Sequence, residues 1–312
     1  MDLATLPIIS LADAPGRVAA DMGASFQTFG FAIVRDHGLD PDHLARAWGL
    51  TQALFALPDA EKRRHIVPGS GGARGFTPFG REIAKGASRH DLKEFWHVGR
   101  DLPHGHPLRS DSMPPNVWPD QLAGFQETFS QLYAEFDRIG AVILSRIAVY
   151  LGLPAGWFED AIADGNSVLR LLHYPPLNGD EDGALRAGAH EDINLITLLL
   201  GAEEAGLELL TRQGRWIGVA PPAGALVVNI GDMLQRLTNN VLPSTTHRVR
   251  NPQSSRAGYS RYAMPFFLHL RSDYRLVTLQ QCISTDNPDR YPVPITADEY
   301  LQKRLREIGL KR

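Results

Sequence analysis

The run of mostly apolar and β-branched residues at 193–200 constrains the fold of this 312-residue chain more than any other stretch. It is too short to cross a membrane, and its branched side chains favour a buried strand. His190 and Asp192 come directly before this run. Because side chains alternate between the two faces of a strand, we expect these two residues on one face and Glu191 on the other.

An imidazole and a carboxylate on one face can supply two ligands of a metal site, whose third ligand must come from elsewhere in the chain. His247, which follows a turn-rich segment, is the candidate. Two histidines and one carboxylate form the facial triad of non-heme Fe(II) oxygenases, which leaves three metal positions open. A lone His-x-Asp motif also arises by chance, so its context matters. Arg261 strengthens that context, because its planar fork suits a carboxylate and an apolar strand has little other use for a buried charge.

Short segments typical of strands, separated by turns that contain Gly and Pro, follow one another from residue 168 to residue 270. Strands at this spacing indicate a β-sandwich or a β-barrel. The predicted strands are 168–174, 192–200, 207–210, 216–219, 225–230, 246–249 and 259–267.

Helices are predicted on both sides of this region. Apolar residues recur at intervals of three and four over residues 121–150, which predicts a long helix packed on a large surface. Towards the N-terminus we expect strands at 6–11 and 31–34 and helices at 14–29 and 41–57, and at the other end a helix at 298–308.

Residues 67–116 are rich in Gly, Pro, Ser and His, which favours a mobile loop. The glycine-rich stretch at 69–72 is not followed by the Lys-Ser/Thr ending of a phosphate-binding loop, and no strand is predicted before it. We therefore do not interpret it as a phosphate site. His97, His104 and His106 have no spacing that competes with the metal triad.

The composition is that of an ordinary globular protein, with 43% hydrophobic and 21% charged residues. A formal net charge of −3 creates no field that would attract nucleic acid or an anionic membrane. Cys282 is the single cysteine, which excludes an intramolecular disulfide and fits a reducing compartment. The N-terminus lacks the features of a signal peptide. We therefore expect a cytoplasmic protein without nucleic-acid or membrane partners, and no feature indicates its oligomeric state.

Several motifs occur in an order that identifies a family. They are residues 6–11, 29–31, 36–38, 91–99, 171–176, 190–197, 229–232, 247–249 and 261–267. Through them the chain resembles the isopenicillin N synthase-like branch of the Fe(II)/2-oxoglutarate-dependent oxygenases. Because the motifs run from about residue 6 to about residue 270, the resemblance covers nearly the whole chain.

The resemblance implies one oxygenase domain over residues 1–312, mainly β with flanking helices. Its core at 166–270 would be a double-stranded β-helix, which is also called a jelly roll and is cupin-like. The long helix within 117–155 would back this core. N-terminal α/β additions and a loop at the mouth of the site would occupy 1–116, and a C-terminal extension with a helix would occupy 271–312.

The resemblance also implies the chemistry. His190, Asp192 and His247 would hold Fe(II), and Arg261 and Tyr174 would bind the distal carboxylate of 2-oxoglutarate, with O2 as the second co-substrate. A small molecule would be hydroxylated or desaturated, with release of succinate and CO2. Arg74, Phe76 and Trp96 are further candidates for substrate contact, although plain packing is the better interpretation of Trp96.

One residue departs from the family pattern. The family has Arg-x-Ser where this chain has Arg261-Tyr262-Ala263, so a hydroxyl donor to the co-substrate is missing. The loss of one such hydrogen bond costs about 0.5–1.5 kcal/mol. Three functions stay open: a 2-oxoglutarate-dependent oxygenase, a co-substrate-free Fe(II) oxidase of the isopenicillin N synthase or aminocyclopropane-carboxylate oxidase type, and a non-catalytic jelly-roll module. Arg261 and Tyr174 favour the first.

Overall fold

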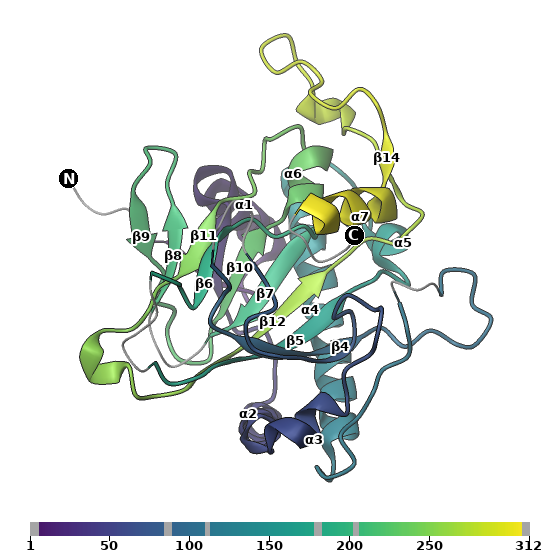
Figure 1. Ribbon diagram of the computed structural model, residues 1–312. Helices are drawn as coiled ribbons and strands as arrows, with labels where there is room; N and C mark the ends of the chain where they lie inside the picture. Colours follow the sequence, from purple (N-terminus) through teal and green to yellow (C-terminus); the bar gives the residue numbers. More distant parts are fainter. Residues whose placement is uncertain (1–5, 84–88, 110–112, 178–182, 202–205, 308–312) are drawn as a thin grey trace.

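Two β-sheets form the centre of the computed structural model, which describes residues 6–83, 89–109, 113–177, 183–201 and 206–307 (Figure 1). In spatial order the larger sheet contains β1 (Ile8–Ser10), β2 (Phe31–Arg35), β10 (Leu226–Ile230), β7 (Ile196–Leu200), β12 (Arg261–Leu268), β5 (Val168–Tyr174), β4 (Glu94–Gly99) and β3 (Gly75–Thr77). The smaller sheet contains β6 (Ala187–His190), β11 (His247–Val249), β8 (Leu207–Leu210) and β9 (Trp216–Gly218). One apolar cluster joins the two sheets, with Phe95, Leu172 and Val227 from the larger and Leu209 and Val249 from the smaller. This is the jelly-roll arrangement that the sequence predicts.

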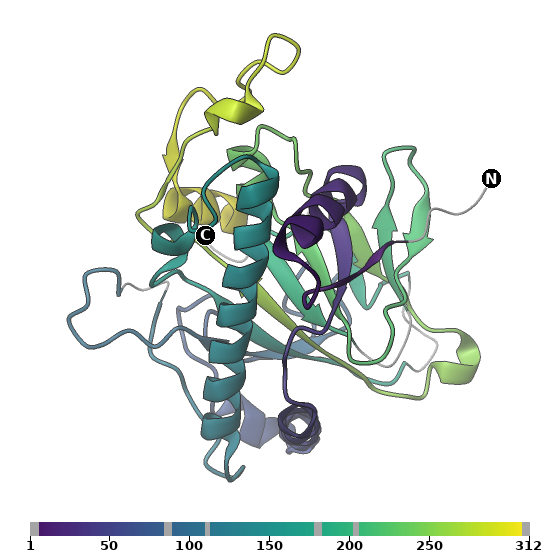
Figure 2. The same cartoon turned by 180° about the vertical axis from the view of Figure 1, so that it is seen from behind.

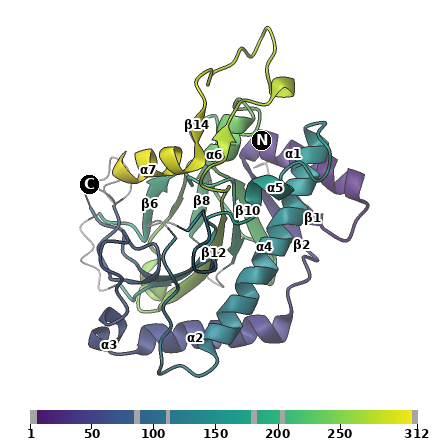
Figure 3. The same cartoon turned by 90° about the vertical axis from the view of Figure 1, so that its right-hand side faces the viewer.

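Helices cover the face of the larger sheet that is turned away from the smaller one. On this face lie α1 (Pro15–Phe29), α2 (Pro41–Ala56) and α4 (Phe125–Tyr150). The other helices are α3 (Asp59–Arg63), α5 (Glu159–Ile162), α6 (Asp232–Leu237) and α7 (Ala297–Glu307). Two 3-10 turns, Ser254–Arg256 and Gln280–Cys282, and the short pair β13 (Arg275–Leu276) and β14 (Ile295–Thr296) complete the described elements. Figure 2 shows α4 running the length of this side beside α1, and Figure 3 shows α2 crossing below it. No helix in the described ranges has both the length and the apolar character needed to cross a membrane.

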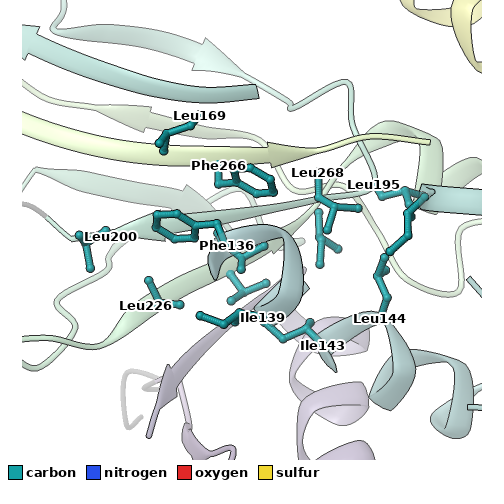
Figure 4. Close-up of a cluster of buried hydrophobic side chains, with 14 of the residues drawn as sticks. Phe136, Ile139, Ile143, Leu144, Leu169, Leu195, Leu200, Leu226, Phe266 and Leu268 are labelled. Atoms are coloured by element: carbon teal, nitrogen blue, oxygen red, sulfur yellow. The ribbon is translucent and has the colours of Figure 1, made fainter. Parts of the chain in front are cut away.

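The contact between α4 and the larger sheet forms the main core (Figure 4). The predicted repeat of apolar residues places Phe136, Ile139 and Ile143 on the side of α4 that faces the sheet. Phe136 stacks on Phe266 with 5.5 Å between ring centroids. A Cβ at Gly140 would lie 2.2 Å from Cδ1 of Leu268, so glycine at this helix position allows the Leu268 side chain to pack closely against α4. The long helix is therefore confirmed, starting at Phe125 rather than at residue 121.

The prediction of one strand over residues 192–200 was wrong at its start. The chain instead forms β6, which ends at His190 in the smaller sheet, and then β7, which begins at Ile196 in the larger. Asn194 stabilises the turn between them, because its side-chain amide donates to the carbonyl oxygen of Ile196 and to Oγ1 of Thr197. His190 and Asp192 therefore converge through a turn between two sheets, and the alternation of one strand does not explain their placement.

The prediction of a loop over residues 67–116 was also wrong in part, because β3 and β4 lie within it. All six residues of β4 are buried, and its polar positions are paired with distant residues: Lys62 donates to Glu94, and Arg170 donates to His97. These long-range partners hide the strand from a local pattern. Phe76 and Trp96 belong to the main core, so the packing interpretation holds for both.

Candidate metal centre and active site

The three predicted metal ligands come together between the two sheets. His190 is the last residue of β6, Asp192 lies in the turn that follows, and His247 begins β11, where it pairs with His190 across the smaller sheet. One ligand atom from each side chain lies within 4.8 Å of the other two. The Nε2 atoms of His190 and His247 are 3.8 Å and 3.9 Å from Oδ1 of Asp192. One metal ion can therefore reach all three groups.

The hydrogen bonds behind these ligands orient them toward a metal. Nδ1 of His190 donates to the carbonyl oxygen of Gly188 at 2.7 Å, and Nδ1 of His247 donates to that of Thr245 at 3.1 Å. These bonds leave both Nε2 lone pairs for an ion. On Asp192, Oδ2 accepts from Thr197 Oγ1 at 2.5 Å and from Asn229 Nδ2 at 2.8 Å. Because Oδ2 is held in this way, Oδ1 is left toward the imidazoles, and such supporting bonds are typical of metal sites.

The protonation states of the triad suit metal binding. Burial and, second, the nearby His247 lower the pKa of His190 to about 4. Burial alone would raise the pKa of Asp192, but the two histidines and the bonds from Asn229 and Thr197 lower it below its usual value. At neutral pH His190 is therefore neutral and Asp192 is a carboxylate, which are the forms that coordinate a metal. The donor set of two imidazoles and one carboxylate fits Fe(II).

Arg261 and Tyr174 lie side by side, as the sequence predicts. They are register partners of β12 and β5, both are buried, and the guanidinium carbon of Arg261 is 5.1 Å from the centroid of the Tyr174 ring. Ala263 is buried two residues further along β12, next to Leu172. A planar cation and a phenol in one buried corner can bind a carboxylate.

A cavity of about 350 Å³ adjoins His190 and Asp192. The segment 70–74, the strands β4, β5 and β12 and the helix α7 contribute to its lining. Arg74 lines it, as proposed from the sequence, whereas Phe76 and Trp96 do not. Sequence reasoning missed several charged residues of its wall, among them Glu82, Asp91, Lys93 and Arg170. Arg170 could have been identified from the sequence as a candidate site residue, because it is the only charged residue in the otherwise apolar stretch 168–172.

Comparisons with known proteins show the family to which the chain belongs. Residues 6–121 match the family described as non-haem dioxygenase in morphine synthesis, N-terminal, and residues 165–270 match the 2OG-Fe(II) oxygenase superfamily. A 2-oxoglutarate-Fe(II) type oxidoreductase of Aspergillus fumigatus is 30% identical, over 89% of this chain and 83% of that protein. The chain belongs to the Fe(II)/2-oxoglutarate-dependent oxygenases.

Solved structures show the same relationship. A putative 2OG-Fe(II) oxygenase family protein from Caulobacter crescentus is 54% identical with a TM-score of 0.90, over 97% of this chain and 99% of that one. A full-length Neurospora crassa protein in complex with alpha-KG and thymine is 27% identical with a TM-score of 0.85, over 96% of each chain. The first of the three functions left open by the sequence is thus confirmed: the chain is an oxygenase that uses Fe(II) and 2-oxoglutarate, built on a jelly roll.

Proposed function

We propose that His190, Asp192 and His247 hold Fe(II), and that Arg261 and Tyr174 bind the distal carboxylate of 2-oxoglutarate. The observation that carries this assignment is the fixed carboxylate of Asp192. Thr197 and Asn229 occupy one of its oxygens, and the other oxygen lies within 4 Å of Nε2 of both histidines. A purely packing role for this carboxylate does not explain why its second oxygen faces two imidazoles.

Bound Fe(II) would supply activation of O2, coupled to the conversion of 2-oxoglutarate to succinate and CO2. The residues of the chain do the rest. Arg261 offers two parallel N–H donors to a carboxylate, and Tyr174 can add a hydroxyl donor. Both residues are buried between the sheets, where little water competes for these bonds. The rings of Phe31 and His247 pack in a T-shaped arrangement with 5.5 Å between their centroids, and this contact keeps the imidazole in place.

The substrate is proposed to be a small molecule that is hydroxylated or desaturated in the cavity beside His190 and Asp192. A volume of about 350 Å³ is at the lower end of the range for small-molecule sites. The thymine in the Neurospora crassa structure is a ligand of this size class. We further propose that the enzyme belongs to the isopenicillin N synthase-like branch and works in the cytoplasm, where the thiol of its single, buried Cys282 stays reduced.

The test is anaerobic reconstitution with Fe(II), followed by titration with 2-oxoglutarate while the weak visible metal-to-ligand band is recorded. We expect the band in the wild-type protein, no band in Asp192→Ala and a weakened titration in Arg261→Ala. Arg248→Ala is the matched control, because Arg248 lies on β11 near the site but is paired with Glu208 at 2.8 Å. It should leave the band unchanged.

Two results would contradict the assignment. Iron binding without the band would indicate that Arg261 and Tyr174 do not hold 2-oxoglutarate. Iron binding that survives in Asp192→Ala would remove the triad from the metal site.

A further inference from the structure

Four charged side chains form a closed set in the wall of the cavity. Nζ of Lys93 lies 2.5 Å from Glu82 and 2.8 Å from Asp91. Arg170 faces Glu82 with its two terminal nitrogens, at 3.3 Å and 3.4 Å from the two carboxylate oxygens. Glu82 therefore accepts from both cations of the set. Two cations and two anions, each paired within the set, leave this wall without net charge.

Glu82 and Lys93 are poorly exposed, and their pairing keeps both of them ionised. Burial alone would raise the pKa of Glu82, but Arg170 and Lys93 hold it well below the usual range. Burial would lower the pKa of Lys93, but Glu82 and Asp91 raise it above the usual range. Glu82 and Lys93 therefore keep their opposite charges at any pH near neutrality.

Among the described residues, the other cations that line the cavity are also engaged. Arg304 of α7 lies 3.1 Å from Asp232 and 2.9 Å from Glu307. Arg74 is completely buried, packs against Gly99 and donates to the carbonyl oxygens of Ala73 and Arg100. Both arginines therefore already have polar partners within the protein.

Two neutral histidines belong to the polar lining, together with other polar residues of the described chain: Ser70, Asn166, Glu191, Asn194 and Thr246. Among these, the carboxylate of Glu191 accepts from Oγ1 of Thr246. The ring of His97 is used at both nitrogens, because Nδ1 donates to Gly72 at 2.6 Å and Nε2 accepts from Arg170 at 2.5 Å. Burial lowers the pKa of His269 to about 4, so its ring is also neutral. Within the part of the chain that the structure describes, the His269 ring makes no hydrogen bond to protein. It can give a ligand a hydrogen bond without a charge.

We propose that this cavity selects an uncharged, hydrogen-bonding small molecule of the carboxamide or lactam class, and that Glu82 sets this selectivity by neutralising Lys93 and Arg170. The proposal rests on the proposed function, because it concerns the substrate of the same site. A charged substrate beside this wall would lose its hydration and find the four charges of the set already paired with one another, and an uncompensated buried charge is costly. An uncharged substrate gives up only hydrogen bonds, which His269 can replace. Phe95 and Phe267, whose rings lie 4.1 Å and 5.1 Å from the Arg170 guanidinium, add flat apolar surface.

Three probes of nearly equal shape test the charge preference: benzamide, benzoate and benzamidinium. The enzyme is loaded with Mn(II) and saturating 2-oxoglutarate, and the relaxation of the probe protons by Mn(II) reports binding close to the metal. We expect benzamide to bind roughly tenfold or more tightly than either ion. In Glu82→Gln the wall gains one positive charge, so the ratio of benzoate to benzamide affinity should rise by roughly tenfold.

A matched control lies outside the cavity. Glu208 of β8 is a poorly exposed carboxylate paired with Arg248 and Arg250, both at 2.8 Å, and Glu208→Gln should leave the three affinities unchanged. If Glu82→Gln does not fold, Arg170→Gln tests the same charge preference, because it changes the net charge of the wall in the opposite direction. It leaves an excess negative charge, so the benzamidinium affinity should rise relative to that of benzamide.

The proposal is overturned if an ion binds the wild-type enzyme as tightly as benzamide, if none of the three probes is relaxed, or if the folded variants leave the affinity ratios unchanged. Binding of Mn(II) and 2-oxoglutarate is measured in the same samples. Loss of these two in the wild-type protein would contradict the proposed function itself. If both bind and only the probes fail, the charge selectivity alone is wrong.

Discussion

The two faces of the larger sheet differ, although the same strands form both. On β5, Leu169 and Leu171 point to α4 and are completely buried among apolar side chains, whereas Arg170 between them points into the jelly roll and lines the cavity. On β12, Phe266 belongs to the main core, and Phe267 lines the cavity. Because side chains alternate between the two faces of a strand, one residue packs in the core and stabilises the fold, while the next residue lines the cavity. The outer face becomes polar near α3, where Lys62 pairs with Glu94 at 2.7 Å.

The largest effect that would test this division is expected from Phe266→Ala. Phe266 is completely buried and packs against Phe136 and Tyr133, so its truncation should lower the free energy of unfolding by about 3–5 kcal/mol. Turnover per folded molecule should stay near that of the wild type. Phe267→Ala is the comparison, because Phe267 is only half-buried: it should cost clearly less stability but weaken binding of the substrate or its analogues. Denaturant titration and single-turnover kinetics measure the two quantities. Equal losses of stability in the two variants would contradict the view that the outer face of the sheet provides stability and the inner face provides the site.

A second prediction compares two buried threonines, one on each side of the larger sheet. Thr197→Val removes a hydroxyl that donates to Asp192 and should weaken Fe(II) binding by about 10–100-fold. Thr51→Val is the matched control, because Thr51 is completely buried on the α4 side, where it donates to the carbonyl oxygen of Ala47 and contacts the sulfur of Met264. Isothermal titration with Fe(II) or Mn(II) compares the affinities. The same loss in both variants would show that general packing, rather than the hydrogen bond to Asp192, controls the metal affinity.

The sequence predicted most readily what depends on local periodicity. The apolar repeat of α4 follows from spacings of three and four, and β8 was placed at its observed bounds because a short apolar run between turns leaves little choice. The clustering of His190, Asp192 and His247 was also predicted, since two histidines and a carboxylate next to predicted strands form a known donor set.

The features that sequence reasoning missed depend on pairing across the fold. β6 consists of small residues and one histidine, Ala187 to His190, so it has no apolar alternation, and it is a strand because it pairs with β11. β4 was hidden because Glu94 and His97 carry polar groups that are paired only in the folded chain. The role of Glu82 could not be read from its neighbours in the sequence, because both of its cationic partners lie on other segments.

Ala263→Ser tests the one departure from the family pattern, on the inner face of β12. The buried position lies two residues from Arg261, so a hydroxyl there can donate to the co-substrate carboxylate. A neutral hydrogen bond contributes about 0.5–1.5 kcal/mol, so the Kd for 2-oxoglutarate should fall by about twofold to tenfold. Tyr262→Phe on the opposite face is the control, with no change expected. If Ala263→Ser weakens co-substrate binding, the site is shaped for alanine, and 2-oxoglutarate binds in a different position from the one proposed.

The smallest expected effect concerns the pH dependence of stability at the inner face. Burial lowers the pKa of His269 to about 4, below the usual value near 6.5 of an unfolded chain. The unfolded state therefore takes up a proton first as the pH falls, and the folded state loses stability between pH 6.5 and pH 4. From pH 7.5 to pH 6 this single residue accounts for roughly 0.8 kcal/mol. Denaturant titrations of metal-free wild-type protein and His269→Gln at both pH values measure it: the variant should lose less stability than the wild type by about that amount. Equal losses would mean that the imidazole is not held neutral by burial, and that the cavity wall there is open to water.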